Sequence, residues 1–112
     1  MNITTVTNDA PFPVNATFES NGGPLLIQFA ASGWSSKAGT IISAELQVDG
    51  ATVVTTKVCT NEATSHKTMV PVAVKTCSIR AGNHTVTVKP GADTNLDQND
   101  FFTITVWEFQ LS

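Results

Sequence analysis

The stretch that decides the fold class runs from Ser78 to Glu108 and reads SIRAGNHTVTVKPGADTNLDQNDFFTITVWE. It begins as a strand, turns at Gly82, continues as a second strand, crosses a polar loop and ends in a third strand. Apolar and polar residues alternate along the last two strands, and this period of two is typical of strands that bury one face. The stretch therefore predicts antiparallel β-structure rather than helix.

The same alternation extends upstream and is clearest over residues 42–48. Asp49-Gly50 follows this segment directly. We expect a type I′ hairpin turn there, because both central positions of that turn take positive φ. Residues 52–58 are then expected to return antiparallel to 42–48.

A proline marks one strand as peripheral. Val70, Val72 and Val74 are expected to share one face of a strand, and Pro71 between them lacks a backbone donor. A strand of this kind belongs at a sheet edge or next to a bulge. With roughly eight to ten strands, turn residues at short intervals and no helical periodicity, residues 1–112 are expected to form a single domain. An antiparallel two-sheet β-sandwich of jelly-roll type is the predicted architecture, and an immunoglobulin-like sandwich is the alternative.

Composition excludes several classes of function. Charged residues make up 13% of the chain and the net charge is −3, whereas nucleic-acid and anionic-membrane binders require dense Lys and Arg. No apolar stretch is long enough to span a membrane. The N-terminus has neither the basic nor the apolar region of a signal peptide, so the chain is expected to be cytoplasmic, to be exported by another route or to have lost a leader.

Two segments resemble the C1q/TNF-like jelly-roll superfamily, in its bacterial or phage form. AGNHTVTV, residues 81–88, is similar to the small-residue turn and apolar strand of that family, and FFTITVWE, residues 101–108, is similar to its closing strand. The resemblance implies a compact homotrimer used for recognition outside the cell, on a cell surface or on a virion. It also implies protein receptors as partners, and sugars for some relatives.

The closing strand is apolar on both faces. One face carries Phe102, Ile104 and Val106, and the other carries Phe101, Trp107 and Phe109. A strand with two apolar faces is usually covered on both sides, whereas the outer face of a solitary two-layer sandwich should be wet. We therefore expect the face with Phe101, Trp107 and Phe109 to be an oligomer interface. The alternative is that a loop or the N-terminal segment covers it.

The chain has two cysteines, Cys59 and Cys77, each near the end of an expected strand. A disulfide between them would close a short loop and contribute on the order of 3 kcal/mol. The alternative is two buried thiols in a reducing compartment. No spacing of Cys and His suggests zinc.

Oxygen-bearing side chains alternate in the loop before the closing strand, at Asp93, Asn95, Asp97, Asn99 and Asp100. This resembles the start of an EF-hand loop, but Gln98 replaces the required Gly and Ile104 replaces the bidentate Glu. The loop remains a ligand-binding candidate, and calcium in another geometry is an alternative to a plain solvated turn. No other cofactor is expected.

Trp34 stands at a strand end beside Ser35 and Ser36, where an indole can stack on a sugar ring. The alternative is that Trp34 fills a core or an interface. His66 lies in a polar loop, and His84 shares a strand face with valines, so it is expected to be a core or interface residue. Neither histidine has a nucleophile at a recognisable spacing, and an enzyme is not expected.

Two functional hypotheses follow. The first is a non-enzymatic trimeric adhesion or receptor-binding head. The second is a small soluble lectin or carbohydrate-binding module that uses Trp34 or the loop of residues 93–100. The two are compatible, because repeated weak sites gain avidity.

Overall fold

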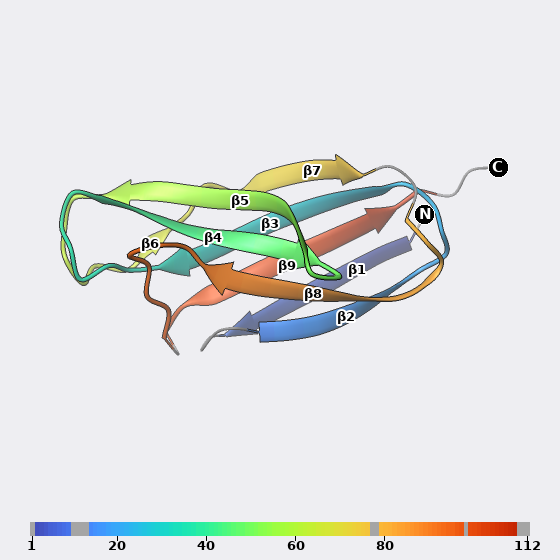
Figure 1. The fold of residues 1–112 in the computed structure, drawn as a ribbon, viewed down its shortest axis with the longest axis horizontal. Coiled ribbons are helices and arrows are strands. Elements are labelled where there is room, and N and C mark those ends of the chain that lie inside the picture. Colours follow the sequence, from blue (N-terminus) through green and yellow to red (C-terminus); the bar gives the residue numbers. More distant parts are fainter. Residues whose placement is uncertain (1, 10–13, 77–78, 98, 110–112) are drawn as a thin grey trace.

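A computed structural model describes residues 2–9, 14–76, 79–97 and 99–109. These residues contain no helix and form two antiparallel sheets packed face to face (Figure 1). The strands are β1 (Asn2–Asp9), β2 (Val14–Ser20), β3 (Leu25–Gly33), β4 (Thr40–Val48), β5 (Ala51–Thr60), β6 (Lys67–Thr68), β7 (Val72–Thr76), β8 (Gly82–Pro90) and β9 (Phe101–Glu108).

The strand order is that of a jelly roll. One sheet runs β1-β9-β3, and both β6 and β7 pair with the free edge of β3; the other sheet runs β2-β8-β4-β5. The chain crosses repeatedly between the sheets, so that β1, β3, β7 and β9 lie in one layer and β2, β4, β5 and β8 in the other (Figure 1). The predicted two-sheet jelly roll is confirmed, and the immunoglobulin-like alternative is set aside. The molecule is elongated, with extents of 50 × 20 × 20 Å.

The hairpin of β4 and β5 turns at Asp49-Gly50, where the sequence predicts it. Asp49 and Gly50 have φ values of 52° and 85°, so both central positions are left-handed. The strands that they join pair antiparallel along their lengths, with one irregularity between Leu46 and Gln47. The hairpin prediction is therefore confirmed.

The strand after Pro71 is peripheral, also as expected, because β7 pairs with β3 and with no other described strand. The expected face is wrong at Val70, which precedes the strand and is 57% exposed. Its backbone explains the difference. The Val70 N–H donates to the carbonyl of Lys57, and its carbonyl accepts from the Thr56 hydroxyl, so this residue bonds to the edge of the opposite sheet.

The core lies between the sheets and follows the alternation. Its buried apolar residues are Phe18, Leu25, Ile27, Phe29, Ala31, Ile42, Ala44, Leu46, Val48, Met69, Val86, Val88, Phe102, Ile104 and Val106. Every second residue of β3, β4, β8 and β9 points inward, as a strand period of two requires. The opposite residues remain on the two outer faces.

Of the two cysteines, the structure describes Cys59. Cys59 lies opposite Ile41 on the outer side of the β4–β5 pair, where its thiol is exposed and free. Alternation explains this placement, since the neighbouring Val58 and Thr60 point inward. Cys77 lies outside the described residues. No disulfide is found among the described residues.

Candidate functional site

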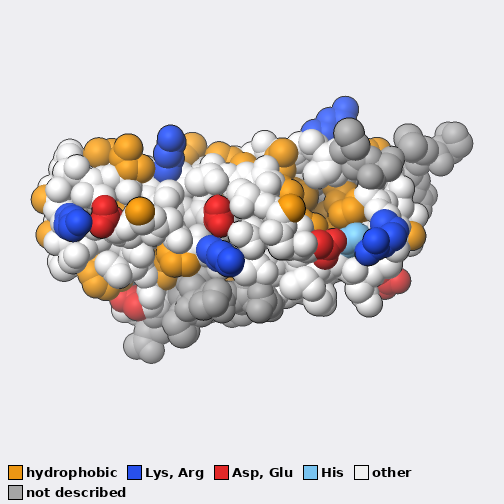
Figure 2. Space-filling model, viewed as in Figure 1, with side chains coloured by type: hydrophobic (Ala, Val, Ile, Leu, Met, Phe, Trp, Pro, Cys, Tyr) orange, Lys and Arg blue, Asp and Glu red, His pale blue; other side chains and the backbone are white. Residues whose placement is uncertain are grey.

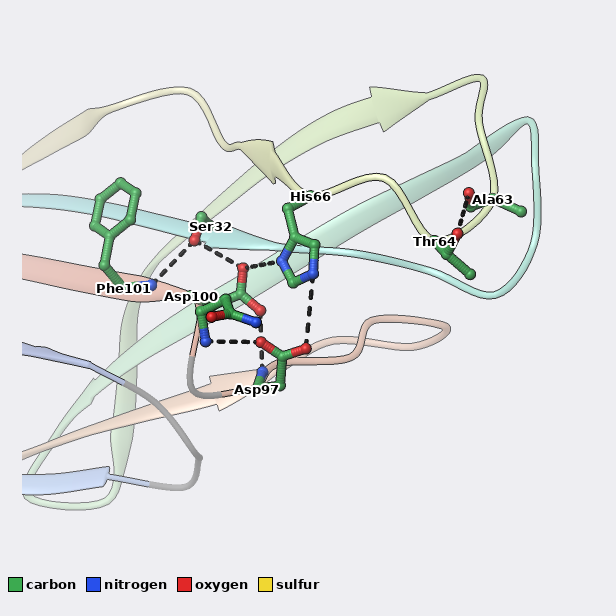
Figure 3. Close-up of polar contacts among 8 residues, drawn as sticks. Ser32, Ala63, Thr64, His66, Asp97, Asp100 and Phe101 are labelled. Atoms are coloured by element: carbon green, nitrogen blue, oxygen red, sulfur yellow. Dashed lines mark hydrogen bonds and ion pairs between the residues drawn. The ribbon is translucent and has the colours of Figure 1, made fainter.

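Four polar side chains from three separate segments meet at one end of the sandwich (Figure 3). Ser32 comes from the end of β3, His66 from the loop before β6, and Asp97 and Asp100 from the loop between β8 and β9. The pairing of β3 with both β6 and β9 brings these segments together. We call His66, Asp97 and Asp100 the end cluster.

Asp100 is the centre of this arrangement, and its side chain is wholly buried. Its Oδ1 lies 2.8 Å from Nδ1 of His66 and accepts a 2.9 Å hydrogen bond from the Ser32 hydroxyl. Its Oδ2 accepts a 3.0 Å hydrogen bond from the backbone N–H of Asp97. A buried carboxylate needs such donors to offset its lost hydration. These bonds fix the position of Asp100 relative to both loops.

His66 is oriented by that carboxylate and remains partly open to solvent. Its Nε2 lies 3.6 Å from Oδ2 of Asp97, and the two side chains are 38% and 39% exposed. The hydrogen bond to Asp100 raises the pKa of His66 above its ordinary value, and the charges of Asp100 and Asp97 add to this effect against desolvation. The other oxygen of Asp97, Oδ1, accepts from the backbone N–H of Asn99 at 2.8 Å.

Trp34 adjoins the end cluster. Its backbone N–H and carbonyl both bond to Asn95, at 3.0 Å and 2.7 Å. Its indole is half-buried and lies 6.0 Å from the His66 ring, tilted by 42°. The indole Nε1 is buried and has no hydrogen-bond partner among the described residues. Trp34 is therefore neither a fully buried core plug nor a freely exposed platform.

The alternating loop residues do not all turn toward one point. Asp93, with a φ of 56°, pairs with Nζ of Lys37 at 3.0 Å on the surface. Asn95 bridges to Trp34, and only Asp97 and Asp100 join the end cluster. The sequence did not indicate His66 as their partner, because no local pattern links a histidine to carboxylates more than thirty residues away.

A second surface of interest is the outer face of the β1-β9-β3 sheet. Phe101 and Trp107 are half-buried there, and Phe109, beyond the end of β9, is 38% exposed. The Trp107 indole donates a 2.7 Å hydrogen bond to Oε1 of Gln28 on β3. The prediction that β9 is apolar on both faces is confirmed.

This outer face is hollowed rather than flat. Two depressions of about 350 Å³ each lie on it. One is lined by residues that include Gln28, Ala30, Ala73 and Thr105. The other, almost wholly apolar, is lined by Pro24, Leu26, Lys75 and Phe109.

Comparison with known proteins identifies the fold alone. No family model and no curated protein sequence matches this chain. Among solved structures, the TNF Eiger from S. frugiperda matches with a TM-score of 0.60 and 13% identity, over 98% of this chain and 87% of that one. The similarity confirms a TNF-like jelly roll at the level of the fold.

Two sugar-related structures also match in fold. The CBM36-1 domain of a multidomain xylanase from the hindgut metagenome of Trinervitermes trinervoides has a TM-score of 0.51 and 15% identity, over 98% of this chain and all of that one. The C-terminal domain of EclA, a sugar-binding protein, has a TM-score of 0.51 and 13% identity, over 96% and 79% of the two chains.

The described residues contain no helix long and apolar enough to cross a membrane.

Proposed function

We propose that this chain is a non-enzymatic recognition module that assembles as a homotrimer and presents its remaining surface to a protein receptor. The carrying observation is the outer face of the β1-β9-β3 sheet, where Phe101 and Trp107 are half-buried on the side opposite the core. Aromatic side chains on the outer face of a sheet favour an interface. The fold shared with a TNF supports this reading.

The hydrogen bond between Trp107 and Gln28 supports burial of this face on assembly. An indole N–H that enters an interface without a partner is costly, because the donor loses its water. Gln28 supplies the acceptor from within the same chain. The face can then be covered by a second copy without leaving the donor unsatisfied.

The charge on one face of the molecule gives no support to a nucleic-acid partner. On the face shown in Figure 2, Lys, Arg, Asp and Glu are scattered among neutral side chains and form no basic patch. This function implies that the protein acts outside the cell, on a cell surface or on a virion.

Oligomeric mass tests the proposal directly. Light scattering on the purified chain should give the mass of three subunits. Thr105→Glu places a charge at the centre of the outer face, since Thr105 lies on β9 opposite Gln28, and should yield a folded monomer. Thr17→Glu is the matched control, because Thr17 is exposed on β2 in the other sheet. A monomeric parent protein would overturn the proposal.

Carbohydrate binding is the second candidate function, and the half-buried indole of Trp34 at the end cluster favours it. Exposed edges of an aromatic ring beside carboxylates and an imidazole suit sugar rings and their hydroxyls. The folds shared with a xylanase CBM36-1 domain and with sugar-binding EclA support it. A glycan array should show binding that Trp34→Ala abolishes and Trp107→Ala retains. A blank array with folded protein would remove this candidate.

A further inference from the structure

We propose that the end cluster is a binding site for a divalent transition-metal ion of the Zn²⁺ type, with His66 Nε2 and Asp97 Oδ2 as its protein ligands and Asp100 as a positioning residue. One ligand atom from each of His66, Asp97 and Asp100 lies within 4.8 Å of the other two. This inference goes beyond the proposed recognition function and does not depend on trimer assembly.

The arrangement around His66 is that of a metal-ligating histidine. A ligating imidazole almost always donates its second ring N–H to a carboxylate, which fixes the tautomer and the ring orientation. Nδ1 of His66 lies 2.8 Å from Oδ1 of Asp100, and Ser32 and the Asp97 backbone hold that carboxylate in place. Nε2 is thereby directed away from Asp100 and toward Asp97.

The distance between the two proposed ligand atoms fits one shared ion. Two atoms bound to Zn²⁺ at about 2.0–2.1 Å in tetrahedral geometry lie roughly 3.4 Å apart. Nε2 of His66 and Oδ2 of Asp97 are 3.6 Å apart, which is longer than a good hydrogen bond. Both side chains are more than one-third exposed, so a hydrated ion can enter and keep its remaining water ligands.

The Trp34 indole adds an independent observation. Its Nε1 is buried without a partner in the described part of the chain, and its ring packs beside His66. An unsatisfied buried donor indicates an ordered water or other acceptor that completes the local network.

The donor set favours a transition metal over calcium. Ca²⁺ takes six to eight oxygen ligands, whereas imidazole suits Zn²⁺, Ni²⁺ and Cu²⁺. His66 contributes nitrogen, and Asp93 is held by Lys37 away from such an oxygen shell. The ion binds the lone pair of Nε2, so any proton held there is released to solvent on binding.

Calorimetric titration of the untagged, folded protein with zinc chloride at about pH 7 tests the site. We expect one ion per chain. Asp97→Asn and His66→Gln should weaken binding at least about tenfold, and Asp100→Asn should weaken it by about 10–100-fold. Asp93→Asn is the matched control, because it removes an equal charge from the same loop. It should leave the affinity unchanged.

Nuclear magnetic resonance of the imidazole nitrogens keeps the proposal falsifiable if a variant fails to fold. In the parent protein, zinc should shift the Nε2 resonance of His66 and leave both ring nitrogens of His84 unchanged, since both already have acceptors. Absence of saturable binding, equal weakening by Asp93→Asn and Asp97→Asn, or no shift at His66 would each overturn the proposal.

Discussion

Nδ1 of His84 lies 2.5 Å from Oδ2 of Asp49, and this contact joins β8 to the turn between β4 and β5. The opposite ring nitrogen, Nε2, lies 2.6 Å from the carbonyl of Arg80. Both nitrogens face acceptors, so the imidazole is satisfied when it carries two protons. The ring is buried and stacks on Phe18 at 5.5 Å. His84 is therefore a structural residue of the core margin, as its strand position predicts.

This pair makes stability depend on pH. The hydrogen bond to Asp49 raises the pKa of His84, and the Arg80 carbonyl adds to it, against desolvation and the Arg80 charge. The stabilisation that protonated His84 provides is complete below its unfolded-state pKa of 6.5, and it is lost as pH rises through the raised folded-state pKa. The same hydrogen bond lowers the pKa of Asp49 below its ordinary value of 3.8. The stabilisation that ionised Asp49 provides is therefore lost as pH falls through this lowered pKa. The pair is strongest between these limits.

We expect His84→Gln to lower the free energy of unfolding by about 1.5–3 kcal/mol at about pH 5.5, because it removes charge-assisted hydrogen bonds. The loss should shrink at about pH 8.5. Urea denaturation at both pH values measures this, and Asp49→Asn should behave in the same direction. The His66 side chain titrates in both proteins, so the comparison isolates His84. Identical pH profiles for parent and His84→Gln would contradict the assignment.

Substitutions of Trp107 test whether the outer face of β9 is a trimer interface. Trp107→Ala removes the largest side chain of the proposed trimer interface and should shift the mass in light scattering toward a monomer. Trp107→Phe retains an aromatic ring and lacks only the N–H given to Gln28, so it should remain largely trimeric. The hypothesis fails if both variants keep the parent mass at low protein concentration.

Two isoleucines test whether burial, rather than residue type, sets stability. Ile104 is fully buried between the sheets, whereas Ile41 is 56% exposed. Ile104→Ala should cost about 2–5 kcal/mol through lost burial and the cavity left behind. Ile41→Ala should cost less than about 0.5 kcal/mol. Thermal and chemical denaturation measure both values, and similar losses would show that the inward face of β9 is assigned incorrectly.

The thiol of Cys59 provides a chemical test of the β5 register. Because this thiol is exposed and free, alkylation of the native protein without reductant should modify Cys59. Peptide mapping by mass spectrometry identifies the site, and Cys59→Ser serves as the control. Recovery of a peptide linked through Cys59 and Cys77 would restore the disulfide that the sequence suggests.

The sequence indicated only part of the candidate site. Asp97 and Asp100 stand out because oxygen ligands alternate around them, and Trp34 stands out as an indole at a strand end. Their actual partner, His66, is brought to them by strand pairing, since β6 and β9 both bond to β3. Asp93 fits the local pattern equally well, yet it pairs with Lys37.

Sequence alone determined what depends on neighbouring residues: the period of two in β4, β8 and β9, the left-handed turn at Asp49-Gly50, and the two apolar faces around Trp107. These follow from side-chain direction and backbone sterics within a few residues. Tertiary structure decided what depends on distant pairing. It placed Leu25 opposite Glu108, His84 against Asp49 and His66 against Asp100. Such contacts depend on the register and order of strands across two sheets, which no local period specifies.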